Sequence, residues 1–236
     1  MNAEPTKRRD FLHTLASAAG LAFAGCATMA GARGGQDGRA GGKEEDWVAP
    51  GEDLMREHGV LRRVMFLYDE AVRRLEAREE LPLDVLVSAA GIIRRVIEDY
   101  HERLEEEFLF PRFERAGQQV QLVAVLRQQH QAGRAVTDNL VDLARSPVRV
   151  DADRGQLALL LRSFNRMYRP HAAREDTVLF PAFHELVGEK AYLELGEQFE
   201  DKEKAVLGER GFEKAVDEVG KLEAALGLDD LARFTP

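Results

Sequence analysis

The chain has 236 residues, of which 44% are hydrophobic and 32% are charged, a composition typical of a soluble globular protein. Its net charge is −9 and no basic stripe follows the N-terminus, so nucleic acid is not an expected partner. The single cysteine, Cys26, excludes an internal disulfide. Ala, Leu, Glu and Arg dominate and long β-branched alternation is absent, which predicts an all-α fold.

Residues 1–32 are predicted to be an export signal rather than part of the fold. Arg8 and Arg9 precede Phe-Leu and a short apolar run, an order that resembles a twin-arginine signal. The run is shorter than the roughly 20 residues that span a membrane. The alternative is a basic N-terminus that leads into an ordinary helix. Under the first interpretation the protein is exported to the periplasm or cell envelope.

Cys26 lies where the apolar run ends, in "AFAGCA", which resembles a lipoprotein processing site. Phe23 departs from that pattern, in which Leu is usual, and simple cleavage near Ala32 is the alternative. Lipidation would tether the protein to a membrane, although one acyl chain alone binds weakly. Residues 33–50 are mostly Gly-rich and polar, which predicts a flexible linker between this end and a folded domain.

Four stretches with helical spacing of apolar residues follow, at residues 52–79, 83–110, 118–145 and 155–183. Pro82 and Pro147 mark the breaks between them. Pro111 and Gly117 are expected to end the second helix, and Pro181 the fourth. Long helices with short connections lie antiparallel. We therefore expect an up-down-up-down four-helix bundle over residues 51–187.

The tail from residue 188 to residue 236 contains several glycines that limit helix length. It is expected to form a short C-terminal helical extension, of one or two helices, that packs on the outside of the bundle.

Four of the six histidines fall on the predicted apolar faces, one on each helix: His58, His101, His130 and His171. Glu105 and Glu175 lie four residues after the second and fourth of these, on the same helical face. Buried carboxylates are costly unless they are paired or bind metal, and Arg134 is the only obvious cation nearby. Two divalent or trivalent metal ions, with imidazole and carboxylate ligands, would compensate this cluster.

The spacing of the histidines supports a single site. His58 and His101 are 43 residues apart, and His130 and His171 are 41 apart, so two hairpins with equal arms bring all four to one depth. A metal-free, hydrogen-bonded network of the same side chains is the alternative. His13 lies in the predicted export signal, and His184 is expected to be structural or exposed.

The segment "HERLEEEFLFPRF" at residues 101–113 has a near copy, "HAAREDTVLFPAF", at residues 171–183. With one more histidine before each copy, the pattern resembles the hemerythrin-like, His-His-Glu cation-binding family over about residues 50–187. The resemblance implies a non-haem di-iron centre in which Glu105 and Glu175 bridge the two irons. It also implies the terminal ligands His58, His101, His130 and His171. Oxygen and nitrogen ligands would accept manganese as well.

The sequence departs from oxygen-carrying members of that family at Arg134, where those proteins place a further histidine. An open metal position would suit oxygen or peroxide reacting at the metal, or sensing, better than simple carriage. Glu102, Glu106 and Asp176 are either outer or spare ligands, or solvated acids. Tyr100 and Tyr168 either donate hydrogen bonds to the site or pack with their hydroxyls at the surface.

The expected function is therefore an exported di-iron protein that binds oxygen or a reduced oxygen species, such as peroxide. Iron storage or buffering without turnover is one alternative, and a metal-free structural bundle is another. Twin-arginine transport carries folded proteins, which would allow metal loading before export. The sequence leaves open whether the protein is a carrier, a sensor or an enzyme, and which protein partner it has.

Overall fold

The computed structural model describes residues 48–146 and 151–236. The predicted export signal, Cys26, His13 and most of the predicted linker lie outside these residues. Within the described residues the regular structure is helical and contains no strand, as the composition predicted. None of the described helices combines the length and the apolar character needed to cross a membrane.

The predicted first and third helices are α1, Pro50–Ala77, and α5, Val120–Arg145. The second and fourth are longer helical paths in which α-helical segments alternate with π-helical turns. The second path consists of α2 Leu83–Ile92, η1 Ile93–His101, α3 Glu102–Leu104, η2 Glu105–Leu109 and α4 Phe110–Ala116. The fourth consists of α6 Asp151–Arg174, η3 Glu175–Leu179 and α7 Phe180–Val187.

The prediction that the prolines end two helices is wrong. Pro111 is the second residue of α4, and the helical path continues past it to Ala116. The preceding π-helical turn closes with the Phe110 N–H donating to the Glu105 carbonyl, so Pro111 stands in a new first turn. A missing N–H costs little there, because first-turn donors have no partner within the helix. The same arrangement recurs at Pro181.

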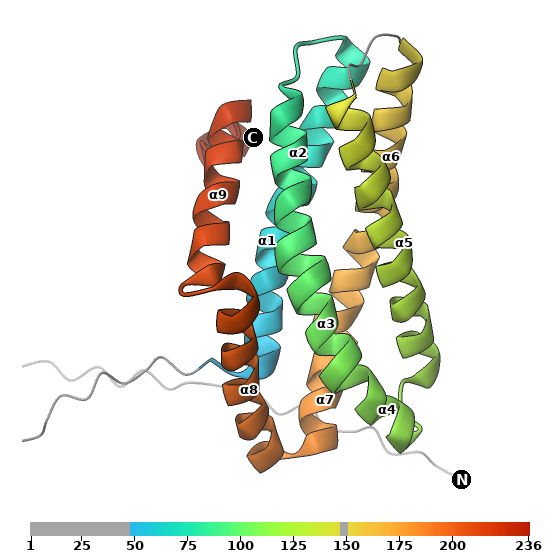
Figure 1. The fold of residues 1–236 in the computed structure, drawn as a ribbon, viewed down its shortest axis with the longest axis vertical. Helices are drawn as coiled ribbons and strands as arrows, with labels where there is room; N and C mark the ends of the chain where they lie inside the picture. Colours follow the sequence, from blue (N-terminus) through green and yellow to red (C-terminus); the bar gives the residue numbers. More distant parts are fainter. Residues whose placement is uncertain (1–47, 147–150) are drawn as a thin grey trace, which may run out of the picture. The chain divides into compact units, whose positions relative to one another are not determined.

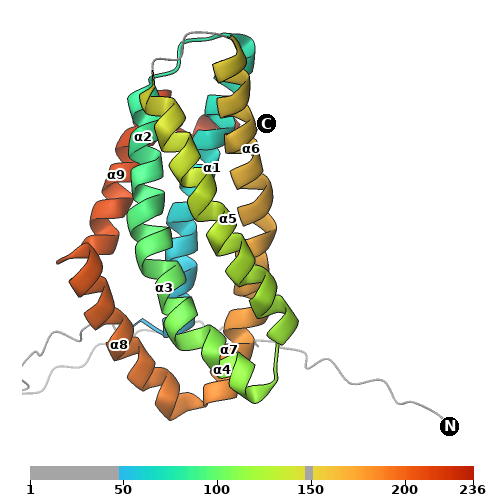
Figure 2. The ribbon, with the colours of Figure 1, turned by 45° about the vertical axis from the view of Figure 1, so that its right-hand side comes forward.

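The long helices lie side by side as a helical bundle, which both ribbon views show (Figures 1 and 2). α6 packs against both α1 and α5, and α5 packs against α2. This arrangement turns one face of each helix toward a shared interior.

Beyond the bundle, the chain forms α8, Glu189–Leu207, and α9, Gly211–Leu226, followed by a 3-10 turn, Leu231–Phe234. α9 lies along α1 and α2 on one flank (Figure 1). Arg63 holds it there by donating to both carboxylate oxygens of Glu223, at 2.8 and 2.5 Å. Near the start of α1, the Tyr192 hydroxyl of α8 accepts from the Gly51 N–H at 2.7 Å. The tail therefore braces α1 at two levels.

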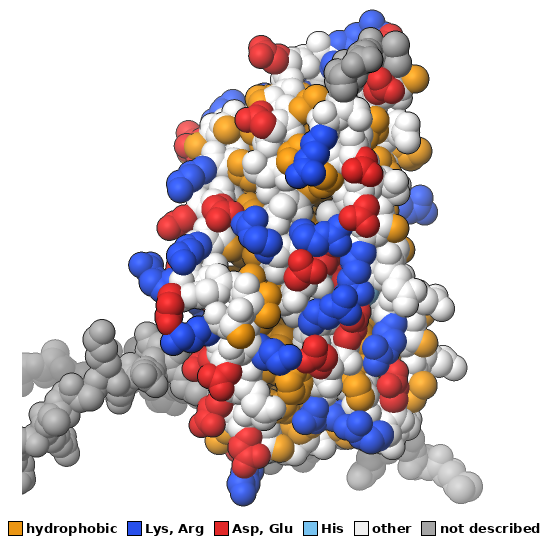
Figure 3. Space-filling view, in the orientation of Figure 1, with side chains coloured by type: hydrophobic (Ala, Val, Ile, Leu, Met, Phe, Trp, Pro, Cys, Tyr) orange, Lys and Arg blue, Asp and Glu red, His pale blue; other side chains and the backbone are white. Residues whose placement is uncertain are grey.

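The surface carries both signs of charge. On the face shown in Figure 3, Lys and Arg side chains are interspersed with Asp and Glu side chains and with smaller apolar areas. This face therefore presents no basic stripe of the kind that binds a polyanion.

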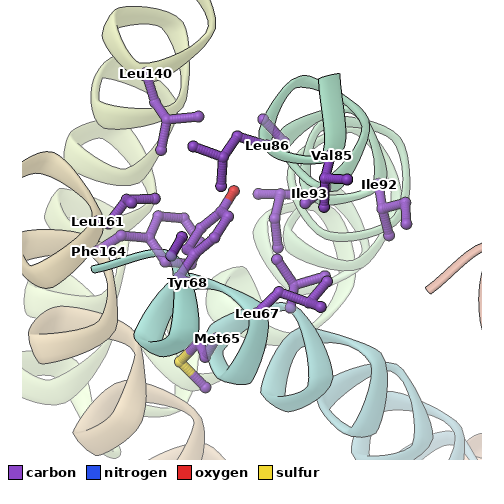
Figure 4. Packing of buried hydrophobic residues seen from close by; sticks show 14 of the residues in the cluster. Met65, Leu67, Tyr68, Val85, Leu86, Ile92, Ile93, Leu140, Leu161 and Phe164 are labelled. Atoms are coloured by element: carbon purple, nitrogen blue, oxygen red, sulfur yellow. The ribbon is translucent and has the colours of Figure 1, made fainter. Parts of the chain in front are cut away.

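The interior of one half of the bundle is apolar. Tyr68 meets Phe164 edge to face, with ring centroids 5.3 Å apart, and Leu86, Ile93 and Leu161 surround the pair (Figure 4). All five side chains are buried. The predicted apolar faces are thus confirmed here, and this packed layer supports the polar residues that lie farther along the same helices.

Candidate metal centre

The six side chains that the sequence singled out come together inside the bundle. All are buried, and the most exposed of them, His171, has an exposed fraction of 4%. Their ligand atoms form two groups, within each of which the atoms lie no more than 4.8 Å apart. One group is His58, His101 and Glu175, and the other is Glu105, His130, His171 and Glu175.

The two carboxylates lie between the imidazoles. Oxygens of Glu175 are 3.3 Å from His58 Nε2 and 3.0 Å from His171 Nε2. For Glu105 Oε2 the corresponding distances are 3.7 Å to His101 Nε2 and 3.4 Å to His130 Nε2. Each carboxylate therefore faces one histidine from its own helical path and one from a neighbouring helix.

The outer nitrogen of each imidazole has an acceptor of its own, and the acceptors follow the internal repeat. His58 Nδ1 is 2.6 Å from Asp176 Oδ1, and His130 Nδ1 is 3.1 Å from Glu106 Oε1. In both cases the acceptor is the residue that follows the buried glutamate of the repeat, Glu175 or Glu105. An acceptor at Nδ1 favours the tautomer with the proton on Nδ1, which leaves the Nε2 lone pair directed at the carboxylates.

The histidines of the second and fourth helical paths show a second repeated contact. His101 Nδ1 is 2.6 Å from Glu57 Oε2, and His171 Nδ1 is 2.9 Å from Gln129 Oε1. Each acceptor directly precedes the histidine of the neighbouring helix. The carboxylate of one half of the repeat is therefore replaced by an amide in the other half.

Two arginines complete the repeat, each four residues after a histidine. Arg62 forms an ion pair with Asp176, and Arg134 lies 2.9 Å from Glu106. Arg134 also lies 2.8 Å from Glu102. Arg134 thus holds two acids on the outer side of the centre.

Several nitrogen and oxygen atoms at the centre of the cluster have no hydrogen-bond partner, as expected for atoms that coordinate a metal. His101 Nε2, His130 Nε2 and both carboxylate oxygens of Glu105 and Glu175 are buried without a hydrogen-bond partner. Leaving such groups unpaired costs free energy that coordinated cations would remove. Two imidazole nitrogens with one carboxylate in the first group, and with two in the second, also form donor sets suited to iron or manganese. The residues present therefore fit a pair of metal ions.

The pKa values of the buried side chains also indicate that the metal-free cluster favours added positive charge. Burial raises the pKa of Glu105 well above its ordinary value, and the charge of Glu175 adds to the effect. Burial lowers the pKa of His101, and the neighbouring His58 lowers it further. Glu175 is opposed by burial, but His171 and His58 outweigh that effect and hold its pKa below the ordinary range. Without cations, one carboxylate therefore favours its neutral form.

The repeated Leu-Phe-Pro-x-Phe segment covers one end of the centre. Phe110 stacks on His130, with ring centroids 5.5 Å apart, and Phe180 stacks on His58 at 5.6 Å, both with planes 25° apart. The last phenylalanines of the two segments lie 6.0 Å from each other. The repeat noted in the sequence therefore supplies both the buried carboxylates and the aromatic rings that cover the imidazoles.

The acids whose role the sequence left open are not freely solvated. Glu102 is fully buried, and its carboxylate accepts from the Tyr168 hydroxyl at 2.7 Å. Burial raises the pKa of Glu102 to about 8. The side chains of Glu106 and Asp176 have exposed fractions of 15% and 16% and contact imidazoles, as described above. Tyr168 is thus connected to the site. The Tyr100 hydroxyl donates to the Phe199 carbonyl at 3.3 Å and also interacts with the carboxylate of Glu57.

Sequence reasoning missed three functional neighbours: Glu57, Gln129 and Glu98. The first two could have been found, because each directly precedes a predicted ligand in an equivalent position of the repeat. Glu98 is buried and accepts from the Thr137 hydroxyl at 2.6 Å, and no repeated pattern marks it. His184 lies outside the cluster, as expected. Its side chain is 48% exposed and pairs with Glu189.

Comparisons with known proteins agree with this geometry. The family model of the hemerythrin HHE cation-binding domain matches residues 49–184. Three relatives are each 43% identical over 232 residues, which cover 97% of this chain and 91% of the relative. They are the uncharacterized proteins Rv1995 of Mycobacterium tuberculosis H37Rv, MT2051 of Mycobacterium tuberculosis CDC 1551 and Mb2018 of Mycobacterium bovis. No solved structure matches the chain significantly. The chain belongs to the hemerythrin HHE cation-binding domain family.

Proposed function

We propose that this protein is a non-haem di-iron protein that binds oxygen or a reduced oxygen species such as peroxide. The observation that carries the proposal is the buried convergence of four imidazole Nε2 atoms on two carboxylates whose oxygens have no hydrogen-bond partner. A metal-free structural network would be expected to pair Glu105 closely as well, but its Oε2 lies 3.4 and 3.7 Å from the nearest imidazole nitrogens. We further propose that the bundle has up-down-up-down connectivity over residues 51–187, with residues 188–236 as its extension.

The two iron positions follow from the two groups of ligand atoms. His58 and His101 would hold one ion, and the second would be held by His130 and His171. Glu175 belongs to both groups, and Glu105 lies within 3.7 Å of an imidazole nitrogen from each, which supports a bridging role for both carboxylates. Manganese is compatible with the same donors.

The chain's own residues would prepare this centre for a small molecule. Bound iron supplies a redox-active Lewis acid to oxygen or peroxide. Position 134 is where the resemblance to oxygen carriers implies a further histidine, and here the guanidinium of Arg134 is occupied by Glu102 and Glu106. Bound iron would then lack one imidazole ligand, and a small molecule would be able to take that position. Phe110 and Phe180 exclude water from the opposite end, which strengthens the electrostatic interactions of the site.

Export remains part of the proposal. The paired arginines and the apolar run of residues 1–32 support transport by the twin-arginine route to the periplasm or cell envelope, with a lipid anchor at Cys26. Residues 33–50 would then link that anchor to the bundle.

Elemental analysis and an optical spectrum test the centre directly. Protein reconstituted anaerobically with iron should contain two iron ions per chain, and after exposure to oxygen it should show an oxo-to-iron absorption band. Less than one ion per chain would contradict the di-iron proposal and favour a metal-free bundle.

Oxygen chemistry is tested separately by mixing the reduced, iron-loaded protein with oxygen or peroxide. A band that reverses on degassing would indicate carriage, and irreversible oxidation with consumption of peroxide would indicate catalysis. Iron that binds and is released with no spectral response to either oxidant would reject the oxygen-binding function and support storage.

A further inference from the structure

The two halves of the centre differ at one pair of equivalent positions. Glu57 and Gln129 each precede a ligand histidine, and each accepts from the outer nitrogen of a histidine on the neighbouring helix. Burial raises the pKa of Glu57, but a cation bound nearby would favour its charged carboxylate, whereas Gln129 has no charged form. The two side chains have almost the same shape, so the repeat is conserved within the chain in geometry but not in charge.

The charge difference falls on one metal position. His58 and His101, which share a position, have the acids Asp176 and Glu57 as acceptors for their outer nitrogens. The other position has one acid, Glu106, and the amide of Gln129. A carboxylate that accepts from an imidazole makes the opposite nitrogen more basic and adds negative charge near the cation. An amide does so far less.

The surrounding cations increase the difference. Arg134 lies against Glu106 and Glu102 with only 19% of its side chain exposed, so its charge stays near the position that has the amide. Arg62, its counterpart at Asp176, is 46% exposed and therefore more strongly screened by water. Glu102 lies near His130 as well, in a group with Glu106 whose ligand atoms are within 4.8 Å of one another, but its carboxylate is paired with Arg134 and accepts from the Tyr168 hydroxyl.

We propose that the two metal positions have unequal affinity, and that the position held by His58 and His101 fills first because Glu57 supports it. This inference rests on the two-metal centre of the proposed function. Ligand number favours the opposite order, since the group that contains His130 and His171 brings four ligand atoms together and the other brings three. The order in which the two positions fill therefore shows whether the charge of the outer acceptors or the number of ligand atoms has the larger effect on metal affinity.

Anaerobic titration calorimetry of the metal-free protein with Fe²⁺ tests the order. Two binding steps are expected, with dissociation constants at least about 10-fold apart, because outer acceptors typically change metal affinity by roughly 10–100-fold. His171→Ala, which damages the second position, should keep the tight step. His101→Ala should keep only the weak step.

The reciprocal exchange of the two acceptors is the sharper measurement. Glu57→Gln should weaken the tight step by roughly 10–100-fold, and Gln129→Glu should tighten the weak step by a similar factor. The double exchange should reverse the order of filling. Both substitutions preserve shape and a hydrogen-bond acceptor, so a purely structural role for these residues would leave both dissociation constants unchanged.

Three outcomes would overturn the inference. The first is filling of the His130 and His171 position before the other in the unmodified protein, and the second is an exchange that leaves both steps unaltered. In each of these two cases Fe²⁺ still binds at two sites and the di-iron proposal survives. The third is no binding of Fe²⁺ at all, which would remove the centre itself and this inference with it.

Discussion

Phe180 stacks on the imidazole of His58, with ring centroids 5.6 Å apart and planes 25° apart. Its counterpart in the repeat, Phe110, stacks on His130 with the same angle and a centroid distance of 5.5 Å. The histidine and the ring come from different helices in both pairs. The two halves of the chain therefore use the same contact to join a histidine of the cluster to a second apolar cluster, which contains both phenylalanines.

Replacing Phe180 by alanine should destabilise the protein and loosen His58. Truncation of a buried phenylalanine typically lowers the free energy of unfolding by about 3–5 kcal/mol, through lost burial and the cavity left behind. Urea denaturation of the metal-free protein measures this loss. Leu159→Ala is the control, because Leu159 is 64% exposed and its truncation should change stability by less than about 0.5 kcal/mol. Equal effects of the two changes would contradict the packing role of Phe180.

His101→Ala should strongly reduce the stabilisation of the protein by metal, because only the weaker binding step would remain. An ion present at 100 times its dissociation constant stabilises a folded protein by about 2.7 kcal/mol, and this gain requires the ligands. The iron-dependent rise in melting temperature should therefore be seen in the unmodified protein and be lost or strongly reduced in the variant. His184→Ala serves as the matched control, since His184 is half-exposed and lies outside the cluster. A variant at position 101 that keeps the full metal-dependent shift would refute the ligand assignment.

The sequence predicted the helical class of the fold and the meeting of the six central side chains, because helical spacing and equal hairpin arms depend only on residue number. It did not predict the π-helical turns that begin at Glu105 and Glu175. Those turns shift the register by one residue, and this shift lets Pro111 remain within a helical path. The helix propensities of single residues do not predict such a shift in register, because it depends on contacts with other helices.

The outer acceptors were missed for a related reason. Glu57 occupies a helical position beside the predicted ligand His58, and its contact is with His101 on another helix. Periodicity along one helix identifies the face that a residue occupies but not its neighbour across the interface. The internal repeat carried that information, because Gln129 makes the equivalent contact with His171.

Gly133→Ala should be destabilising, although alanine favours helix over glycine by about 0.8–1.0 kcal/mol. A Cβ atom at this position would lie 1.9 Å from the Tyr168 hydroxyl oxygen, so the tyrosine would have to move away from Glu102. Overpacking of this kind costs about 1–3 kcal/mol, and the buried acid would also lose its donor. Chemical denaturation measures the net loss.

The paired controls isolate that clash. Gly155→Ala, in α6, has no heavy atom within 4 Å of the new Cβ and should stabilise the protein slightly. Tyr168→Phe removes the hydroxyl oxygen that Gly133 accommodates. The double variant should therefore lose less free energy of unfolding than the sum of the losses of the two single variants. If the two losses of stability simply add, Gly133 is not needed to accommodate the Tyr168 hydroxyl.

Stability should depend on pH in opposite directions at two acids of α1. Burial, with the nearby charge of Glu203, raises the pKa of Asp53 to about 6. The folded state then binds more protons than the unfolded state between about pH 4 and pH 6, so this group lowers stability as the pH rises through that window. Asp53→Asn should therefore raise the free energy of unfolding of the metal-free protein at pH 7, by up to about 3 kcal/mol at about 1.36 kcal/mol per pKa unit, and should have little effect at pH 4.

Glu70 provides the contrast of opposite sign. Hydrogen bonds from Arg73, and then from Arg74, lower the pKa of Glu70 to about 2. Its contribution to stability is present above its ordinary value and is lost as the pH falls toward 2. Glu70→Gln should therefore decrease stability at pH 7, where Asp53→Asn increases it. Denaturation curves of both variants at pH 4, 5.5 and 7 test the pair, and a shift of both in the same direction at pH 7 would show that burial does not dominate at Asp53.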